Sequence, residues 1–358
     1  MAKTLYLHVG MPKCASTSIQ GVLRTHADLF AEHGKFYDIP PRDRTEGQGN
    51  VTGLLADIRN RRTSKVREAL SFFLDRDSDV ILSSEMFIGL ARNSLADDLI
   101  ARAREDGFTP KLICYVRRQD HWIESDYKQH IKGGSDWDDA IGSLVKTRIK
   151  NKVLDYHWLL KNWERSVGRD NMTVVPLQSG QDDLYPLQRF LEFLDMDPAL
   201  AGDLAIARQN VSPPVGLIEP MRYLKRALRL KGMKSTQIPK PLHVFLNEAP
   251  GRIEVPQRRY LLSHKRRVSL LERYEKSNAA LSRDYLGGQP AFDTDVQDDG
   301  VGSNTLATEA ASVLAAWIVS NPEQLERSGT DAAAQADPSG ERRRRLRQVW
   351  RYFVSKSR

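Results

Sequence analysis

One short segment, residues 8–20, combines residue types that could bind an anion. Lys13 precedes three consecutive hydroxyl side chains at 16–18, between an apolar run at 5–9 and a helical pattern from Ile19. A strand, a short loop and a helix then follow one another, and such a turn directs backbone N–H groups and the positive helix end toward one point. The lysine adds a full charge, and the hydroxyls can surround tetrahedral oxygens. The segment predicts a phosphate or sulfate site, with an ordinary Ser/Thr helix cap as the alternative.

Spacing excludes two common phosphate loops. The nucleotide-kinase loop G-x-x-x-x-G-K-[ST] places its lysine directly after a glycine and before the helix hydroxyl. Lys13 instead lies three residues after Gly10, and no glycine precedes it directly. The C-x5-R loop of cysteine phosphatases fails because Gln20 stands six residues after Cys14.

The loop resembles the 5′-phosphosulfate loop of sulfotransferases that use 3′-phosphoadenosine-5′-phosphosulfate (PAPS). That loop follows the pattern P-K-x-G-[ST]-[ST]-[ST], and the matching residues here are Pro12, Lys13, Cys14, Ala15, Ser16, Thr17 and Ser18. The resemblance implies that these residues bind the donor and that Lys13 also serves catalysis. Ala15 replaces the usual glycine, a change that is costly if this position has a positive φ.

A second cluster follows the strand-like run 111–117. PAPS enzymes that resemble this chain carry an arginine at that strand end and a serine eight residues later, and both bind the 3′-phosphate; Arg117 and Ser125 have this spacing. A guanidinium fork suits the 3′-phosphate, which distinguishes PAPS from ATP. The neighbouring Arg118 is expected to be a solvated surface charge.

The run 78–84 predicts another strand, which ends just before Glu85. Ligands of α/β sheets gather at the carboxyl ends of the strands, so Glu85 is expected to share a crevice with Lys13 and Arg117. The family carries a base after this strand, a glutamate in many polysaccharide-modifying members. The resemblance therefore implies that Glu85 is the general base. A helix-capping or salt-bridged glutamate is the alternative.

Weaker candidates complete the expected site. The segment 207–212 resembles a late R-x-N-x-S element, which makes Arg208 and Asn210 candidate contacts to the donor. His8 is expected to point into the sheet. Three residues are weak candidates for lining the acceptor cleft: His121, Trp122 and His130. No H-E-x-x-H or paired C-x2-C spacing occurs in the sequence, and no metal is expected.

Strands and helices alternate along the chain, a pattern typical of a parallel sheet covered on both faces. Strands are expected at 4–9, 78–84, 111–117 and 172–177, with a further candidate at 35–39. Helices are expected at 17–32, 64–75, 95–106, 119–131, 151–167, 183–195, 214–230 and 256–285. The expected fold is therefore α/β, a three-layer sandwich with a central parallel sheet and a P-loop-like phosphosulfate-binding loop.

Composition limits the class of protein. The chain has 358 residues, 40% of them hydrophobic, and a net charge of +8. We find no signal-peptide pattern and no run of ~20 apolar residues, so a cytoplasmic enzyme is expected. The charge suits PAPS and acidic glycans. Nucleic acid is the main rival partner, but no helix-turn-helix, zinc-finger or RNP signature is present. Cys14 and Cys114 are expected to be reduced, and Cys14 at a helix N-terminus is a candidate for a lowered pKa.

The sequence predicts three regions. Residues 1–293 form the sulfotransferase domain, and 294–341 form an acidic Ala-rich segment with one amphipathic helix at 305–320. Residues 342–358 carry seven arginines and one lysine, and their apolar residues recur at helical spacing. This basic tail is a candidate for peripheral contact with an anionic membrane, for binding a polyanion, or for folding back onto the acidic segment.

Together these observations predict transfer of a sulfuryl group from PAPS to a hydroxyl or amine of a carbohydrate or glycoconjugate. The transfer is a single in-line displacement that leaves 3′,5′-adenosine bisphosphate (PAP) as product. Two alternatives stay open: a nucleoside or sugar kinase on a similar fold, and a non-catalytic polyanion-binding protein.

Overall fold

The computed structural model describes residues 3–43, 49–93, 95–133, 135–205, 213–297 and 303–320. The chain divides into two compact units, each built from separate stretches of sequence. The sheet unit comprises residues 1–122, 148–210 and 271–294, and the helical unit comprises 123–147, 211–270 and 295–358.

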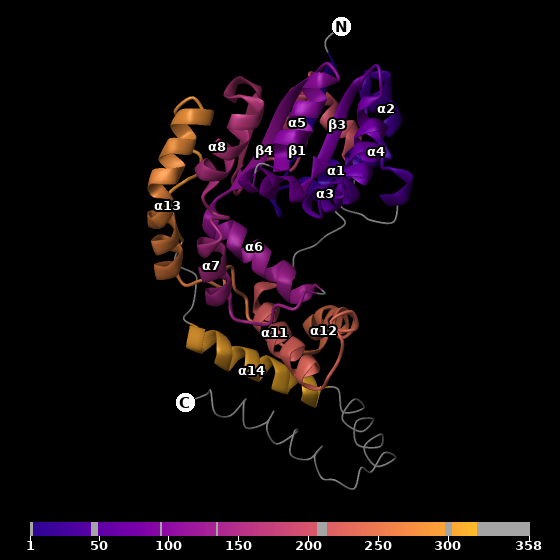
Figure 1. Ribbon diagram of the computed structural model, residues 1–358. Coiled ribbons are helices and arrows are strands. Elements are labelled where there is room, and N and C mark those ends of the chain that lie inside the picture. The colour runs from indigo at the N-terminus through magenta and orange to yellow at the C-terminus, as the bar shows by residue number, and fades with distance from the viewer. Residues whose placement is uncertain are drawn as a thin grey trace. The chain divides into compact units, whose positions relative to one another are not determined.

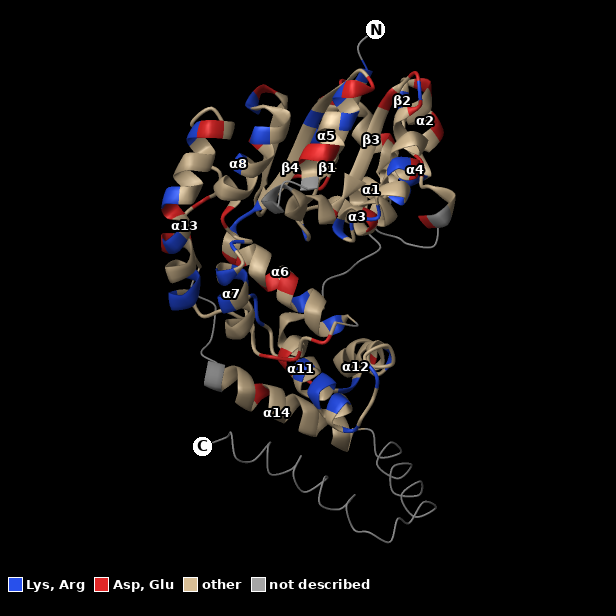
Figure 2. Cartoon of the chain, in the orientation of Figure 1, with Lys and Arg blue, Asp and Glu red and all other residues tan. Residues whose placement is uncertain are grey.

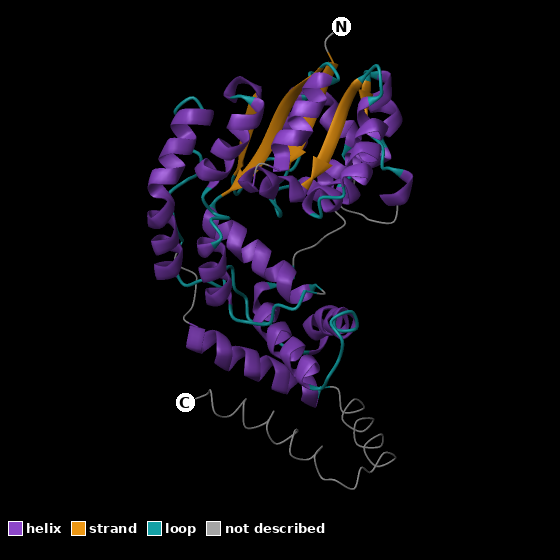
Figure 3. Ribbon diagram, viewed as in Figure 1, coloured by secondary structure: helices purple, strands orange, loops and turns teal. Residues whose placement is uncertain are grey.

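The sheet unit is built on five parallel strands in the order β2-β3-β1-β4-β5, flanked by helices (Figures 1 and 3). The strands are β1 (Lys3–Val9), β2 (Lys35–Phe36), β3 (Asp79–Ser84), β4 (Phe108–Arg117) and β5 (Met172–Leu177). The α/β class and the parallel sheet are confirmed, as are the four main predicted strands. These strands are recognisable because both faces are covered, which makes their sequences nearly continuous apolar runs.

The candidate strand at 35–39 is only two residues long. Its next residues are held in another way, because the Asp38 carboxylate accepts the Ile39 N–H at 2.7 Å. Pro40 follows and has no N–H to offer to a strand ladder.

Most helices of the sheet unit lie in the connections between its strands, and the last two follow β5. They are α1 (Ser16–Thr25), α2 (Ala27–Glu32), α3 (Thr52–Arg59), α4 (Thr63–Leu74), α5 (Leu95–Glu105), α8 (Tyr156–Val167), α9 (Tyr185–Phe193) and α10 (Ala201–Leu204). Four short 3₁₀ segments accompany them: η1 (Pro41–Asp43), η2 (Glu85–Asn93), η3 (Arg169–Asn171) and η4 (Pro198–Leu200). The helix predicted over 151–167 begins only at Tyr156, because the Asp155 carboxylate caps it by accepting the Trp158 N–H at 3.2 Å.

The helical unit contains α11 (Val215–Leu230), α12 (Pro239–Arg252) and α14 (Ser303–Val319), and α6 (Gln119–Lys132), α7 (Ile141–Lys150) and α13 (His264–Tyr285) have residues in both units. The predicted helix at 305–320 is confirmed as α14. It buries an apolar face made of Leu306, Ala310, Val313, Leu314 and Trp317. The Trp317 and Phe245 rings meet edge to face, with their centroids 5.4 Å apart. Residues 321–358, with the basic tail, lie outside the described residues. None of the described helices is long and apolar enough to cross a membrane.

Candidate functional site

The site expected from the sequence lies at one edge of the sheet. Strand β1 is central, with β3 on one side and β4 on the other. The register pairs Val9 with Ser84, so Gly10 follows at the level of Glu85. All three strands are parallel, and their carboxyl ends therefore deliver the loop at 10–15, Glu85 and Arg117 to the same edge.

The loop between β1 and α1 has a strained backbone. Lys13 has φ 67° and Ala15 has φ 62°, both in the left-handed region. The Cys14 N–H donates to the Met11 carbonyl at 3.2 Å, and the first helical bond runs from Ile19 to the Ala15 carbonyl at 3.1 Å. The N–H groups of residues 16–18 precede that bond and so have no partner within the helix. Left-handed geometry costs a non-glycine residue about 1–2 kcal/mol, so surrounding contacts must hold the loop in this shape.

Three features hold the loop in this shape. The Trp122 indole N–H donates to the Pro12 carbonyl at 2.7 Å. The Cys14 side chain, which belongs to the loop itself, is fully buried. Gly10 permits close approach, because a Cβ at this position would lie 3.3 Å from Ser16 Cβ and 3.6 Å from Glu85 Cα. Because Gly10 has no side chain, the end of β1, the start of α1 and the Glu85 residue can lie close together.

A hydrogen bond joins the loop to the expected base. The buried Ser16 hydroxyl donates to Glu85 Oε1, while the neighbouring Thr17 and Ser18 side chains are exposed. Ser16 therefore positions the Glu85 carboxylate, and Thr17 and Ser18 keep their hydroxyls accessible at the helix start. Glu85 has no ion pair with any described residue, which disfavours the salt-bridged alternative.

Two residues that sequence reasoning missed hold the end of β3. The Asn50 side chain donates to the Ile81 carbonyl at 2.9 Å and accepts the Ser83 N–H at 2.9 Å. Gly49 has φ 84°, and a Cβ there would lie 2.0 Å from the Ser83 carbonyl oxygen. These contacts fix the strand end that carries Glu85. The only signal in the sequence was a Gly-Asn pair outside any predicted element.

His8 lies in the sheet, as expected. It is fully buried, its Nδ1 lies 2.8 Å from Ser83 Oγ, and Gln20 Nε2 donates to the same oxygen at 3.2 Å. Burial lowers the pKa of His8 to about 3. The imidazole is therefore neutral at physiological pH.

The expectation of a lowered pKa at Cys14 is wrong. Burial raises the pKa of this thiol to about 12 and outweighs the opposing effect of the Arg117 charge. The Glu85 charge also raises the pKa of Cys14, so both charged groups act on this one buried sulfur. Cys14 and Cys114 are both free thiols.

Arg117 and Arg118 are neighbours in sequence but lie in different environments. Arg117 is half-buried, and its carbonyl accepts the Tyr156 hydroxyl at 2.6 Å. Arg118 is only 4% exposed, so its assignment as a solvated surface charge is wrong. Its guanidinium forms ion pairs with Asp120, at 2.9 Å, and with Asp293. Arg118 is thereby committed to internal carboxylates.

The remaining candidates are distributed as follows. Trp122 is buried, and His121 Nε2 lies 3.1 Å from Arg118 Nη2. Ser125 and His130 are on α6 within the helical unit, and the His130 ring lies 3.1 Å from Ser135 Oγ. The pairing of Arg117 with Ser125 stays a prediction. Arg208 and Asn210 lie outside the described residues.

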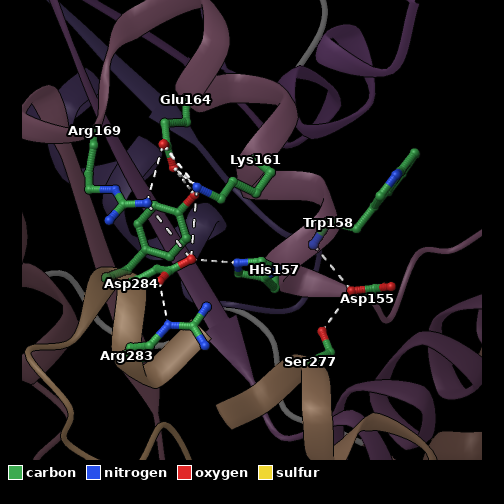
Figure 4. A network of polar contacts seen from close by, with 10 residues as sticks. Asp155, His157, Trp158, Lys161, Glu164, Arg169, Ser277, Arg283 and Asp284 are labelled. Carbon is green, nitrogen blue, oxygen red and sulfur yellow. Dashed lines mark hydrogen bonds and ion pairs between the residues drawn. The ribbon is translucent and has the colours of Figure 1, made fainter. Parts of the chain in front are cut away.

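A second polar cluster joins the end of α13 to α8 (Figure 4). Asp284 accepts from His157 at 2.8 Å, and Glu164 accepts from the Tyr285 hydroxyl at 2.6 Å. Lys161 and Arg169 each lie within ion-pair distance of both carboxylates. Hydrogen bonds from Arg283 and His157, with the charges of Arg283 and Arg169, hold the pKa of Asp284 below its ordinary value. A hollow of about 380 Å³ on α8 is lined by Trp158, Lys161, Asn162, Glu164 and Arg165. The contacts of Asp284 and Tyr285 fasten α13 to α8 and η3, and no residue of this cluster belongs to the loop that follows β1.

Among the described residues, no group of three or more His, Cys, Asp or Glu side chains is arranged to hold a metal ion.

Comparisons with known proteins add no assignment of function. No protein-family model matches the chain, and no solved structure matches it. The chain is 27% identical over 221 residues to an uncharacterized protein of Archaeoglobus fulgidus, an alignment that covers 60% of this chain and 55% of that protein. It thus spans about half the length of the curated relative it matches.

Proposed function

We propose that the chain is a PAPS-dependent sulfotransferase that acts on a hydroxyl or amine of a carbohydrate or glycoconjugate. The observation that carries the proposal is the hydrogen bond from Ser16, in the anion-binding loop, to the Glu85 carboxylate. An anion cradle and a carboxylate at one sheet edge suit a reaction that needs charge neutralisation and proton removal together.

The residues at this edge fit an adenosine donor with two anionic ends. The N–H groups at the start of α1 and the Lys13 charge suit its 5′-phosphosulfate. The Arg117 guanidinium, at the end of the adjacent strand, suits the 3′-phosphate. The strain at Lys13 and Ala15 also supports a functional loop, because strained backbone is retained mainly where a site requires its shape.

The protein's part in the reaction is mostly placement and charge. The bound donor supplies the sulfuryl group and a 5′-phosphate as leaving group. Glu85 removes the proton of the acceptor as the acceptor attacks, and Ser16 orients the carboxylate for that task. Lys13 and the N–H groups of α1 stabilise the negative charge that grows on the leaving phosphate.

Calorimetric titration tests the donor class directly. PAP, ADP and ATP are titrated separately into the purified protein, and we expect tight binding of PAP alone, because only PAP carries the 3′-phosphate. Preference for ATP would contradict the proposal and favour a kinase. If none of the three nucleotides binds, the result would contradict the proposal and favour a non-catalytic protein.

Substitutions then separate binding from catalysis. Lys13→Ala is expected to abolish transfer, because it removes the cation beside the leaving phosphate. Glu85→Gln is expected to retain PAP binding yet lose turnover, since the amide cannot accept the acceptor's proton. Glu105→Gln, at the exposed end of α5, is the matched control and should leave both properties unchanged. Full activity in Glu85→Gln would refute its role as the base.

A further inference from the structure

Helix α11 ends in a rigid turn that carries an exposed leucine between basic residues. The Met233 N–H donates to the Leu228 carbonyl at 3.1 Å and the Gly232 N–H to the Arg229 carbonyl at 2.8 Å, the bonding pattern of a Schellman cap. Gly232 has φ 88°, as this cap requires. Leu230 is 58% exposed at the start of the turn.

The same region has an unusual charge. Residues 220–247 contain seven lysines and arginines and no acidic residue. Arg222 pairs with Glu219 at 2.9 Å, Lys225 donates to the His130 carbonyl at 2.6 Å, and Arg229 pairs with Asp138 at 3.1 Å. These three cations therefore have partners within the helical unit. Figure 2 shows the basic residues gathered along α11 and at its lower end.

Three further lysines serve no such purpose. Lys231, Lys234 and Lys240 are exposed, and they form no ion pair with any described residue. They belong to the turn after α11 and to the first turn of α12. Their charge is therefore available to an anionic partner.

Apolar side chains accompany these lysines. Five large apolar side chains of the described residues are exposed, and one of them, Met86, belongs to the sheet unit. The other four lie on α11, α12 and α14: Leu230, Val244, Ile318 and Val319. Helices α12 and α14 are in contact through the Phe245 and Trp317 rings, and Val244 and Ile318 directly neighbour these two aromatic residues in sequence.

We propose that the lysines and exposed apolar residues at the ends of α11, α12 and α14 form a docking surface for an anionic lipid membrane. A lysine near such a membrane contributes about 1 kcal/mol, and exposed apolar side chains enter the boundary between headgroups and acyl chains. A polyanionic glycan or a nucleic acid would meet the lysines but would leave Leu230 in water. The combination therefore favours lipid, and the basic, apolar composition of residues 342–358 suits the same partner.

The surface is tested on the full chain by co-sedimentation with vesicles of phosphatidylcholine alone and of an equal mixture with phosphatidylglycerol. We expect binding to the anionic vesicles only. The triple variant Lys231→Glu, Lys234→Glu, Lys240→Glu should bind them on the order of 100-fold more weakly, because three favourable charges of about 1 kcal/mol each are lost.

A matched triple variant controls for overall charge. Lys65→Glu, Arg67→Glu and Arg104→Glu make the same change in net charge at exposed positions of α4 and α5, in the sheet unit. This control should retain most of the vesicle binding. If both triple variants lose binding equally, or if neither loses it, the lysines of the helical unit do not form the surface and the proposal fails.

Leu230→Ser distinguishes lipid from other polyanions. It should weaken binding to anionic vesicles about 10-fold, because Leu230 is already partly covered and entry into the membrane buries only the rest of its side chain. Binding to inorganic polyphosphate should not change. If Leu230→Ser binds the vesicles as well as the unaltered chain does, the surface binds polyanions generally. If the unaltered chain binds neither kind of vesicle, or binds both equally, the proposal is overturned. None of these measurements depends on PAP binding or sulfuryl transfer.

Discussion

The backbone strain at Ala15 leads to a prediction about stability that has an unusual sign. Ala15 has φ 62° and ψ 1°, a left-handed conformation that costs an alanine about 1–2 kcal/mol. Glycine adopts it freely but loses about 0.4–1 kcal/mol through the greater entropy of its unfolded chain. Ala15→Gly should therefore raise the free energy of unfolding by about 0.5–1 kcal/mol, although it removes a methyl group.

The assay is urea unfolding followed by tryptophan fluorescence, with Ala101→Gly as the matched control. Ala101 is exposed in the interior of α5, where glycine should lower the free energy of unfolding by about 0.5–1 kcal/mol. The two substitutions are chemically identical, and only the backbone conformation separates them. If Ala15→Gly destabilises the protein as much as Ala101→Gly does, position 15 is not strained, and the argument for a loop held against its own preference is refuted.

Three further predictions concern the supports of the site. Gly49→Ala should destabilise the protein in thermal unfolding by about 3 kcal/mol more than the control Gly180→Ala does. The two glycines have nearly the same φ, 84° and 82°, but only a Cβ at Gly49 would meet a backbone oxygen, at 2.0 Å. Trp122→Phe should cost about 1–3 kcal/mol in urea unfolding and weaken PAP binding, because the Pro12 carbonyl loses its donor; unchanged values for both would contradict the role of this contact. His8 stays neutral in the folded chain to about pH 3 but takes up a proton near its ordinary pKa of 6.5 when unfolded. Stability should therefore fall by about 1.4 kcal/mol per pH unit between these values as the pH is lowered, and a His8→Gln variant with the same acid slope would argue against this assignment.

The sheet could be predicted from the sequence because its strands are buried on both faces. The runs at 5–9 and 111–117 are mostly apolar, and the first leads into the loop at 10–15 while the second ends at Arg117. Parallel pairing then brings those ends to one edge, so the meeting of the loop with Glu85 follows from topology.

Helix α12 was not predicted because it contains three prolines, at 239, 241 and 250. Proline in a sequence pattern usually indicates a loop, but the first turn of a helix tolerates it, since N–H groups there have no helical partner. The third proline lies at the other end, two residues before the last helical residue.

Contacts between distant residues explain the errors in the site. Arg118 could not be recognised as buried, because its partner Asp293 lies 175 residues later in the chain. The pKa of Cys14 was predicted from the helix N-terminus alone, whereas complete burial of the sulfur dominates. The Asn50 side chain hydrogen-bonds to the backbone of β3, and an asparagine in a loop gives no indication of such a role in the sequence.

The interleaving of the two units has a consequence for synthesis of the chain. The sheet unit needs residues 271–294, which follow two long stretches that belong to the helical unit. While the chain emerges from the ribosome, β1, β3 and β4 can associate early, but Arg118 has only the nearby Asp120 as an ion-pair partner until Asp293, at the end of that last stretch, has appeared. A buried cation is stabilised further by each carboxylate that pairs with it. The sheet unit should therefore complete its folding late, and neither unit can be transplanted into another protein as one continuous segment.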